Sequence, residues 1–116
     1  MGIIKCFDAA AMVIEEATER FKPSMSLNTK KLDVFKQYCD IIDDLAEEFE
    51  GESFEVEVDE ITMEVTVALE CGEVIIESSD HVFYELIKRT NRYIFTQSEE
   101  GNLVIKFVFP PLWEKA

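Results

Sequence analysis

The chain has 116 residues, of which 47% are hydrophobic and 31% charged, and its 25 acidic and 11 basic residues give a net charge of −14. This composition excludes a disordered chain, and the length predicts a single domain that spans residues 1–116. The negative charge repels nucleic acid and anionic lipid, so it favours basic proteins or cations as partners. The three cysteines form no C-x-x-C pair, which excludes a zinc-finger spacing and favours free thiols in the cytoplasm.

The first predicted element is a helix over residues 3–21. Its apolar side chains recur at spacings of four and three and form one helical stripe, and they are Ile3, Phe7, Ala10, Ile14, Ala17 and Phe21. Acidic residues on both sides of the apolar patch at residues 9–14 argue against a signal peptide or a membrane span. Pro23 ends the helix.

A second helix is expected after a short link, with Ser26 or Asn28 as its N-cap and Gly51 as the residue that ends it. One row of large apolar side chains lies along it, formed by Phe35, Tyr38, Ile42, Leu45 and Phe49. The short link predicts that the two helices form an antiparallel hairpin. Their stripes are expected to pack in the core, and the alternative is a coiled-coil partner. Apart from this alternative, a homodimer is among the expected partners.

From Phe54 the apolar period changes to two, which predicts β-strands. A two-residue turn at residues 59–60 would place Phe54 opposite Val65 and keep the apolar side chains of both strands on one face.

A second tight turn, at residues 71–72, would pair Leu69 with Val74 in a third strand and leave Cys71 exposed at its tip. Residues 78–80 are of the kinds that cap helices, so a third helix is expected to follow and to cross over to the last strands.

The register of the last predicted hairpin follows from its apolar pattern. A three-residue turn at residues 99–101, with Gly101 in the left-handed conformation, places Phe95 opposite Ile105 and matches the apolar faces of both strands. Two prolines, at residues 110–111, end the second of these strands.

These elements follow the order α-α-β-β-β-α-β-β, which is an α+β fold with an N-terminal helical hairpin, a mostly antiparallel sheet and one crossover helix. Over residues 28–109 this order is similar to that of type III secretion chaperones, which are also small, acidic and cytosolic. The resemblance rests on element order and charge, and it implies a dimer with apolar grooves for an unfolded segment. The chain differs in its first helix and in the ending PPLWEKA, where those chaperones have a final helix.

The acidic residues concentrate in the middle of the chain, since residues 37–87 contain 17 of the 25 acidic residues and neither Lys nor Arg. In the predicted register Glu55 lies opposite Glu64 on the outward face, and like charges across strands destabilise a sheet by roughly 0.2–1 kcal/mol per pair. Four explanations fit such a face: screening by salt, bases or another subunit lying across it, a basic partner, and a Ca²⁺ or Mg²⁺ site.

Catalytic residues cannot be identified from the sequence, and neither enzyme activity nor a cofactor is expected. The single histidine, His81, falls in the first turn of the third predicted helix, and a nucleophile would have to reach it in the fold. Glu70 and Glu73 flank Cys71 and should raise the pKa of its thiol, which argues against a reactive cysteine. Trp113 either closes one end of the core or forms an exposed anchor for a partner.

The sequence therefore predicts a non-enzymatic binding or adaptor protein that contacts a basic polypeptide through an acidic sheet face. The residues expected to bind the partner are Glu55, Glu57, Glu64, Thr62, Thr66 and Trp113. A chaperone, an immunity protein and a mimic of nucleic acid charge are variants of this interpretation. The alternatives are a carboxylate-based divalent-metal site or enzyme around His81, and an oligomerising subunit of a larger assembly. Neither nucleic acid nor a membrane is expected as a partner.

Overall fold

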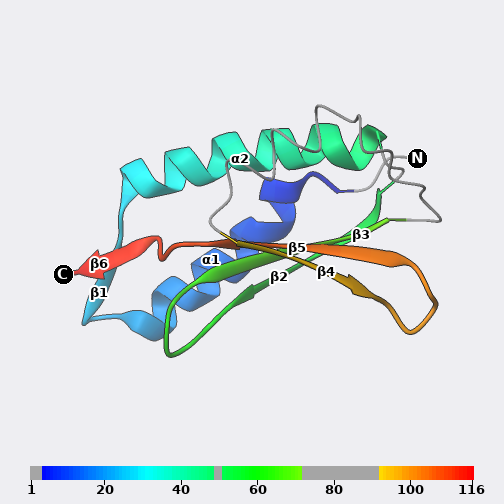
Figure 1. The fold of residues 1–116 in the computed structure, drawn as a ribbon. Helices are drawn as coiled ribbons and strands as arrows, with labels where there is room; N and C mark the ends of the chain where they lie inside the picture. The colour runs from blue at the N-terminus through cyan, green and yellow to red at the C-terminus, as the bar shows by residue number, and fades with distance from the viewer. Residues whose placement is uncertain (1–3, 49–50, 72–91) are drawn as a thin grey trace.

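The computed structural model describes residues 4–48, 51–71 and 92–116. Two helices, α1 (Cys6–Phe21) and α2 (Thr29–Glu48), precede a four-stranded antiparallel sheet of order β2-β3-β5-β4. Its strands are β2 (Gly51–Val58), β3 (Val65–Cys71), β4 (Arg92–Gln97) and β5 (Leu103–Phe109). Two short strands that the sequence did not predict, β1 (Met25–Leu27) and β6 (Trp113–Lys115), pair with each other near the C-terminus (Figure 1). The predicted α+β class is confirmed.

The two helices form the predicted hairpin, with β1 in the link between them. Asn28 caps α2, because its Oδ1 accepts a hydrogen bond from the Lys31 N–H at 3.0 Å, whereas Ser26 lies in β1. The helices run in opposite directions, with α2 along the length of the sheet and α1 beside β2 (Figure 1).

The core lies between the helices and one face of the sheet. Strand β3 alternates along its whole length, with Val65, Val67, Leu69 and Cys71 fully buried on the core face. The helices bury their predicted stripes against this face, with Ala10, Ile14 and Ala17 from α1 and Phe35, Ile42 and Leu45 from α2. Burial of each large apolar side chain contributes roughly 1.5–3 kcal/mol, so the packing on this face stabilises the fold.

The hairpin that joins β2 and β3 has a different register from the predicted one. Phe54 pairs with Leu69 and not with Val65, because a longer loop over residues 59–64 replaces the predicted turn at residues 59–60. The shift in register is even, so the apolar residues of β2 keep the core face. The pattern of the sequence is therefore satisfied by both registers, and the loop decides between them.

The side chain of Asp59 stabilises this loop. Its Oδ1 accepts hydrogen bonds from the N–H groups of Ile61 and Thr62, each at 2.8 Å, in the manner of an Asx turn. These bonds hold the pKa of the Asp59 carboxyl below its usual value. The predicted turn at residues 59–60 would make Ile61 the first residue of the next strand, with its side chain on the apolar face. Ile61 lies in the loop instead and is 91% exposed.

Strand β3 lies in the interior of the sheet, which corrects two predictions. Leu69 pairs with Phe54 on one side and with Ile105 on the other. Both neighbouring strands are therefore occupied, and the predicted pairing of Leu69 with Val74 is wrong. Cys71 ends this central strand and is fully buried, whereas the sequence predicted it at an exposed hairpin tip. The predicted third strand and third helix, together with Phe49, lie outside the described residues.

Gly51 begins β2 and pairs with Cys71, so its predicted role as the residue that ends α2 is wrong. The position is closely packed, because a Cβ there would lie 2.8 Å from Cδ1 of Leu69 and 2.9 Å from Cβ of Ala46. The missing side chain allows the start of β2 to approach α2.

The hairpin that joins β4 and β5 has the predicted register. Phe95 pairs with Ile105, and Gly101 has a φ of +89°, in the region that favours glycine. The Ser98 N–H donates to the Asn102 carbonyl at 2.9 Å and closes the three-residue turn. Here the apolar pattern and the turn chemistry select the same register.

Candidate functional site

The outer face of the sheet is the face opposite the core. Three of the predicted partner-binding residues lie on it, namely Glu55 and Glu57 on β2 and Thr66 on β3, where Thr66 pairs with Glu57. Both glutamates are exposed and Thr66 is half-buried. The sheet therefore gathers these three residues on one surface, and none of the described helices covers it.

Glu64 and Thr62 lie in the loop over residues 59–64 and not in the strands of the sheet. The Glu64 N–H donates to Oγ1 of Thr62 at 3.3 Å. Glu55 pairs with Ala68, so the predicted opposition of Glu55 and Glu64 is wrong. The register of β2 and β3 is the reason, and the repulsion expected from that glutamate pair does not arise.

Trp113 is part of the core and not an exposed anchor. Its side chain is 2% exposed, and its Nε1–H donates to Oγ1 of Thr18 at 2.9 Å. The indole also meets the ring of Phe21 edge to face, with ring centroids 5.0 Å apart. A buried indole N–H needs a partner, and Thr18 on α1 supplies it, so Trp113 closes the end of the core beside β1 and β6.

The outer face is less uniformly acidic than predicted, because β5 brings a base to its centre. Lys106 pairs with Ala68 of β3 on one side and with Ile94 of β4 on the other. Among the strands, the acidic side chains of this face therefore lie on β2 and β3.

A hollow of about 640 Å³ lies in this face. Among the described residues that line it, four carboxylates stand against one ammonium, namely Glu55, Glu70, Glu99 and Glu100 against Lys106. The volume falls within the range of roughly 300–1,000 Å³ that ligand sites occupy. Its excess of negative charge suits a cationic group.

One more carboxylate, that of Glu52, comes near Glu70 of this hollow at an irregularity in β2. Glu52 lies where the register of β2 and β3 shifts, as in a β-bulge, and a bulge redirects a side chain. Asn102 then bridges two acids, because its Nδ2 donates to Glu52 at 3.4 Å and to Glu70 at 3.2 Å. Neither Glu52 nor Asn102 is predicted as a site residue from the sequence, since the alternating pattern carries no signal for a bulge.

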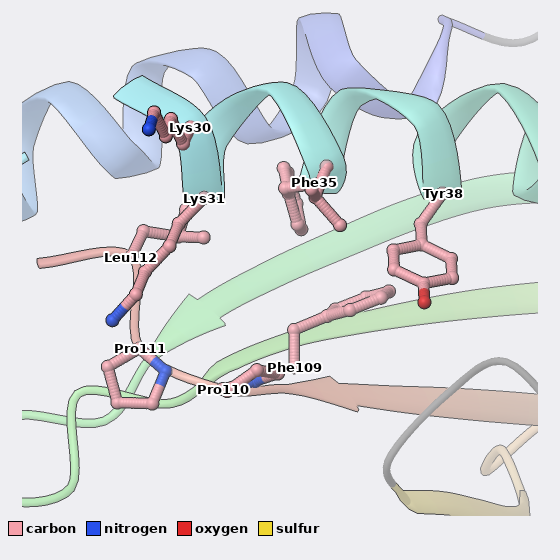
Figure 2. Close-up of a pocket in the computed structure, with 9 residues that line it drawn as sticks. Lys30, Lys31, Phe35, Tyr38, Phe109, Pro110, Pro111 and Leu112 are labelled. Atoms are coloured by element: carbon pink, nitrogen blue, oxygen red, sulfur yellow. The ribbon is translucent and has the colours of Figure 1, made fainter. Parts of the chain in front are cut away.

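An apolar groove of about 260 Å³ lies between the first half of α2 and residues 109–112 (Figure 2). Its lining is almost entirely apolar and consists of Val34, Phe35, Tyr38, Phe109, Pro110, Pro111 and Leu112, with Lys30 and Lys31 at one end. The aromatic rings are fixed by mutual contact, since the centroid of Phe109 lies 5.1 Å from that of Phe35 and 5.6 Å from that of Tyr38. The two prolines make the opposite wall stiff.

Lys30 and Lys31 lie in the first turn of α2, which contains no acidic residue. The amino end of a helix carries partial positive charge, so a cation there is unfavourable by roughly 0.3–1 kcal/mol. Among the described residues, no carboxylate forms an ion pair with either lysine. The end of the groove is therefore a positive spot on a strongly negative chain.

The three cysteines are unsuited to nucleophilic chemistry. All are free and buried, and burial, followed by the charges of Glu52 and Glu70, raises the pKa of the Cys71 thiol to about 11. The pKa of Cys6 is also raised, first by its hydrogen bond with Cys39 and then by burial. These two thiols stay protonated at neutral pH, and a protonated thiol is a poor nucleophile.

Within the part of the chain that the structure describes, no three His, Cys, Asp or Glu side chains are placed to hold a metal ion. His81 lies outside that part, and so does the site predicted around it. None of the described helices combines the length and the apolar character needed to cross a bilayer. Comparison with known proteins finds no matching family, no matching curated protein and no matching solved structure.

Proposed function

We propose that the protein is a non-enzymatic binding module of the cytoplasm that contacts a basic polypeptide through the outer face of its sheet. The observation that carries this proposal is the hollow in that face, where four carboxylates stand against one ammonium among the described lining residues. Side chains of Lys or Arg are the polypeptide groups that such a hollow favours.

Protection of a sheet edge is a simpler explanation for some of this charge. Strand β2 is an edge strand, and charged residues on edge strands discourage pairing with other chains. That explanation covers Glu55 and Glu57 but not Glu70, which lies on the interior strand β3, nor Glu99 and Glu100, which lie in the turn after β4. The acids that edge protection leaves unexplained are the ones that line the hollow with Glu55.

Binding would begin with attraction over distance and end with short-range contacts. The net charge of −14 speeds the approach of a basic chain, and this attraction weakens as salt shortens the Debye length. On the surface, Ile94 is 49% exposed beside Lys106 and offers an aliphatic contact in place of the buried Trp113. Lys106 would repel a base placed directly over it, and so would limit the positions that a basic segment can take.

A chaperone-like or immunity-like protein remains the class of function that we propose, with a folded or unfolded basic protein as its partner. Self-association as a homodimer belongs to the same proposal. Nucleic acid and membrane surfaces are excluded from it, because both carry the same sign of charge as this face.

The test measures the binding of a fluorescent ten-residue oligolysine peptide by anisotropy at low and moderate salt. The double variant Glu55→Lys/Glu70→Lys changes the hollow, and Glu15→Lys/Glu16→Lys makes the same change in net charge on exposed positions of α1. We expect the first variant to bind at least tenfold more weakly than the second, with both melting at temperatures close to that of the unaltered protein.

Equal weakening in both variants would contradict the proposal, since it would mean that net charge alone attracts the peptide. Unchanged binding in the hollow variant would contradict it as well. An oligoglutamate peptide of the same length serves as the control for nonspecific adhesion and should not bind.

A further inference from the structure

The groove beside α2 combines two features that the outer face lacks. Its walls are apolar side chains held in fixed positions, and its open end carries Lys30 and Lys31. Figure 2 shows the Lys31 side chain directed from α2 toward the segment that contains Leu112 and Pro111, at the end of the groove away from Tyr38.

The size of the groove sets the size of its occupant. An apolar cavity of about 150 Å³ is enough to hold benzene, and this groove offers about 260 Å³. That is room for a short aliphatic chain or a substituted ring, and it is too little for a folded partner. Val34 contributes to its rim and is 49% exposed, so the groove is open to solvent.

The positive charge at the open end of the groove determines the sign of the charge that a ligand should carry. Two lysines stand where the helix already carries partial positive charge, and no described carboxylate pairs with them. An anion at this position would interact with the Lys31 ammonium, which points toward the groove, and with the amino end of α2 (Figure 2). Lys30 adds a second positive charge to the same turn of the helix. A cation or a neutral head group would gain none of these interactions.

We infer that the groove binds a small amphipathic anion, with an apolar body over Phe35 and Phe109 and a carboxylate or phosphate head group beside Lys31 and the amino end of α2. The apolar part displaces water from the aromatic and proline walls, and the head group stays at the solvent-exposed end. This site lies apart from the outer sheet face and takes a ligand of the opposite charge, so the inference does not rest on the proposed function.

The test compares decanoate with decyltrimethylammonium, both below the concentrations at which they form micelles. Calorimetry measures affinity, and amide shifts in a ¹⁵N-labelled sample locate the bound molecule. We expect saturable binding of decanoate with shifts at Val34, Phe35 and Leu112, and binding of the cationic amphiphile at least tenfold weaker.

Two variants and their controls connect the affinity to the groove. Val34→Glu places a carboxylate in it and should abolish decanoate binding, whereas Met12→Glu, at an exposed apolar position of α1, should leave it unchanged. Lys30→Glu/Lys31→Glu should weaken decanoate binding at least tenfold, whereas Lys22→Glu should change it less than twofold. Oligolysine binding in the Val34→Glu variant should match that of the unaltered protein, which keeps this test separate from that of the outer face.

Three results would overturn the inference. Absence of saturable binding would remove the site, and equal affinity for both amphiphiles that survives lysine reversal would reduce it to general apolar adhesion. A native dimer that dissociates in Val34→Glu would assign the groove to a second copy of the chain.

Discussion

The two faces of the four-stranded sheet differ in what holds their side chains in place. On the core face, Val65, Val67 and Leu69 are fully buried against both helices. On the outer face of the same strand, Thr66, Ala68 and Glu70 are half-buried with no described helix above them. Adjacent residues of one strand thus differ in role, since the core face determines stability and the proposed binding surface lies on the outer face.

Two of the concave surfaces formed by the described residues show the same division. The hollow of the outer face is lined by carboxylates around Lys106, and the groove beside α2 is apolar with lysines at one end. A chain of net charge −14 therefore presents surfaces of opposite electrical sign on separate elements. Changes in either surface should alter binding without unfolding the protein.

The largest expected effect comes from the core face. Leu69→Ala should lower the free energy of unfolding by about 2–5 kcal/mol, because the side chain is fully buried and leaves a cavity. Thr66→Ala, three residues away on the outer face, should cost less than about 1 kcal/mol. Urea unfolding of both variants measures the difference, and similar losses would contradict the division between the two faces.

Overpacking at Gly51 should have the next largest effect. A methyl group there would lie within 2.9 Å of Cβ of Ala46, so Gly51→Ala must displace α2 or β2 and should cost about 1–3 kcal/mol. Ser53→Ala, at an exposed position of the same strand, is the matched control and should be close to neutral. A stabilised Gly51→Ala variant would mean that the start of β2 adjusts freely.

The bond between Trp113 and Thr18 tests the structural role of the indole. Thr18→Val should cost about 1–3 kcal/mol, because it leaves the buried indole N–H without its acceptor. In a Trp113→Phe background the same substitution should cost clearly less, since that N–H is then absent. Equal costs in both backgrounds, measured by urea unfolding, would show that the bond contributes nothing.

A smaller effect concerns the Cys71 thiol, whose pKa of about 11 in the folded protein exceeds its ordinary value of 9.0. The unfolded chain loses this proton first, so the stabilisation is complete below pH 9 and is lost as the pH rises toward 11. Unfolding measured at several alkaline pH values should therefore show a shallower decline in Cys71→Ala. An unchanged decline would mean that the thiol is not held in its neutral form.

The contrast between the two hairpins explains how far the sequence could predict this fold. In the β4–β5 hairpin, Gly101 fixes the turn and the apolar pattern fixes the register, so both gave the observed pairing. In the β2–β3 hairpin the pattern is equally clear, but it is satisfied by any even shift. The hydrogen bonds of Asp59 decide the loop, and sequence periodicity does not report side-chain bonds of that kind.

The residues of the two candidate sites could be predicted from the sequence to different degrees. The period of two placed Glu55, Glu57 and Thr66 on one face correctly, because side-chain alternation does not depend on register. The contributions of Glu70, Glu99 and Lys106 depend on which strands are neighbours, and β5 comes to lie beside β3 only through long-range pairing. The groove depends on residues 109–112 folding back beside α2, which no local pattern indicates.

The most direct test of the central claim is a ¹⁵N–¹H titration of the labelled protein with the oligolysine peptide. We expect saturable amide shifts confined to residues 53–57, 68–70 and 96–106, with α1 and the groove beside α2 unaffected. Shifts of equal size around Glu15 and Glu16, or their absence from the outer face, would contradict it.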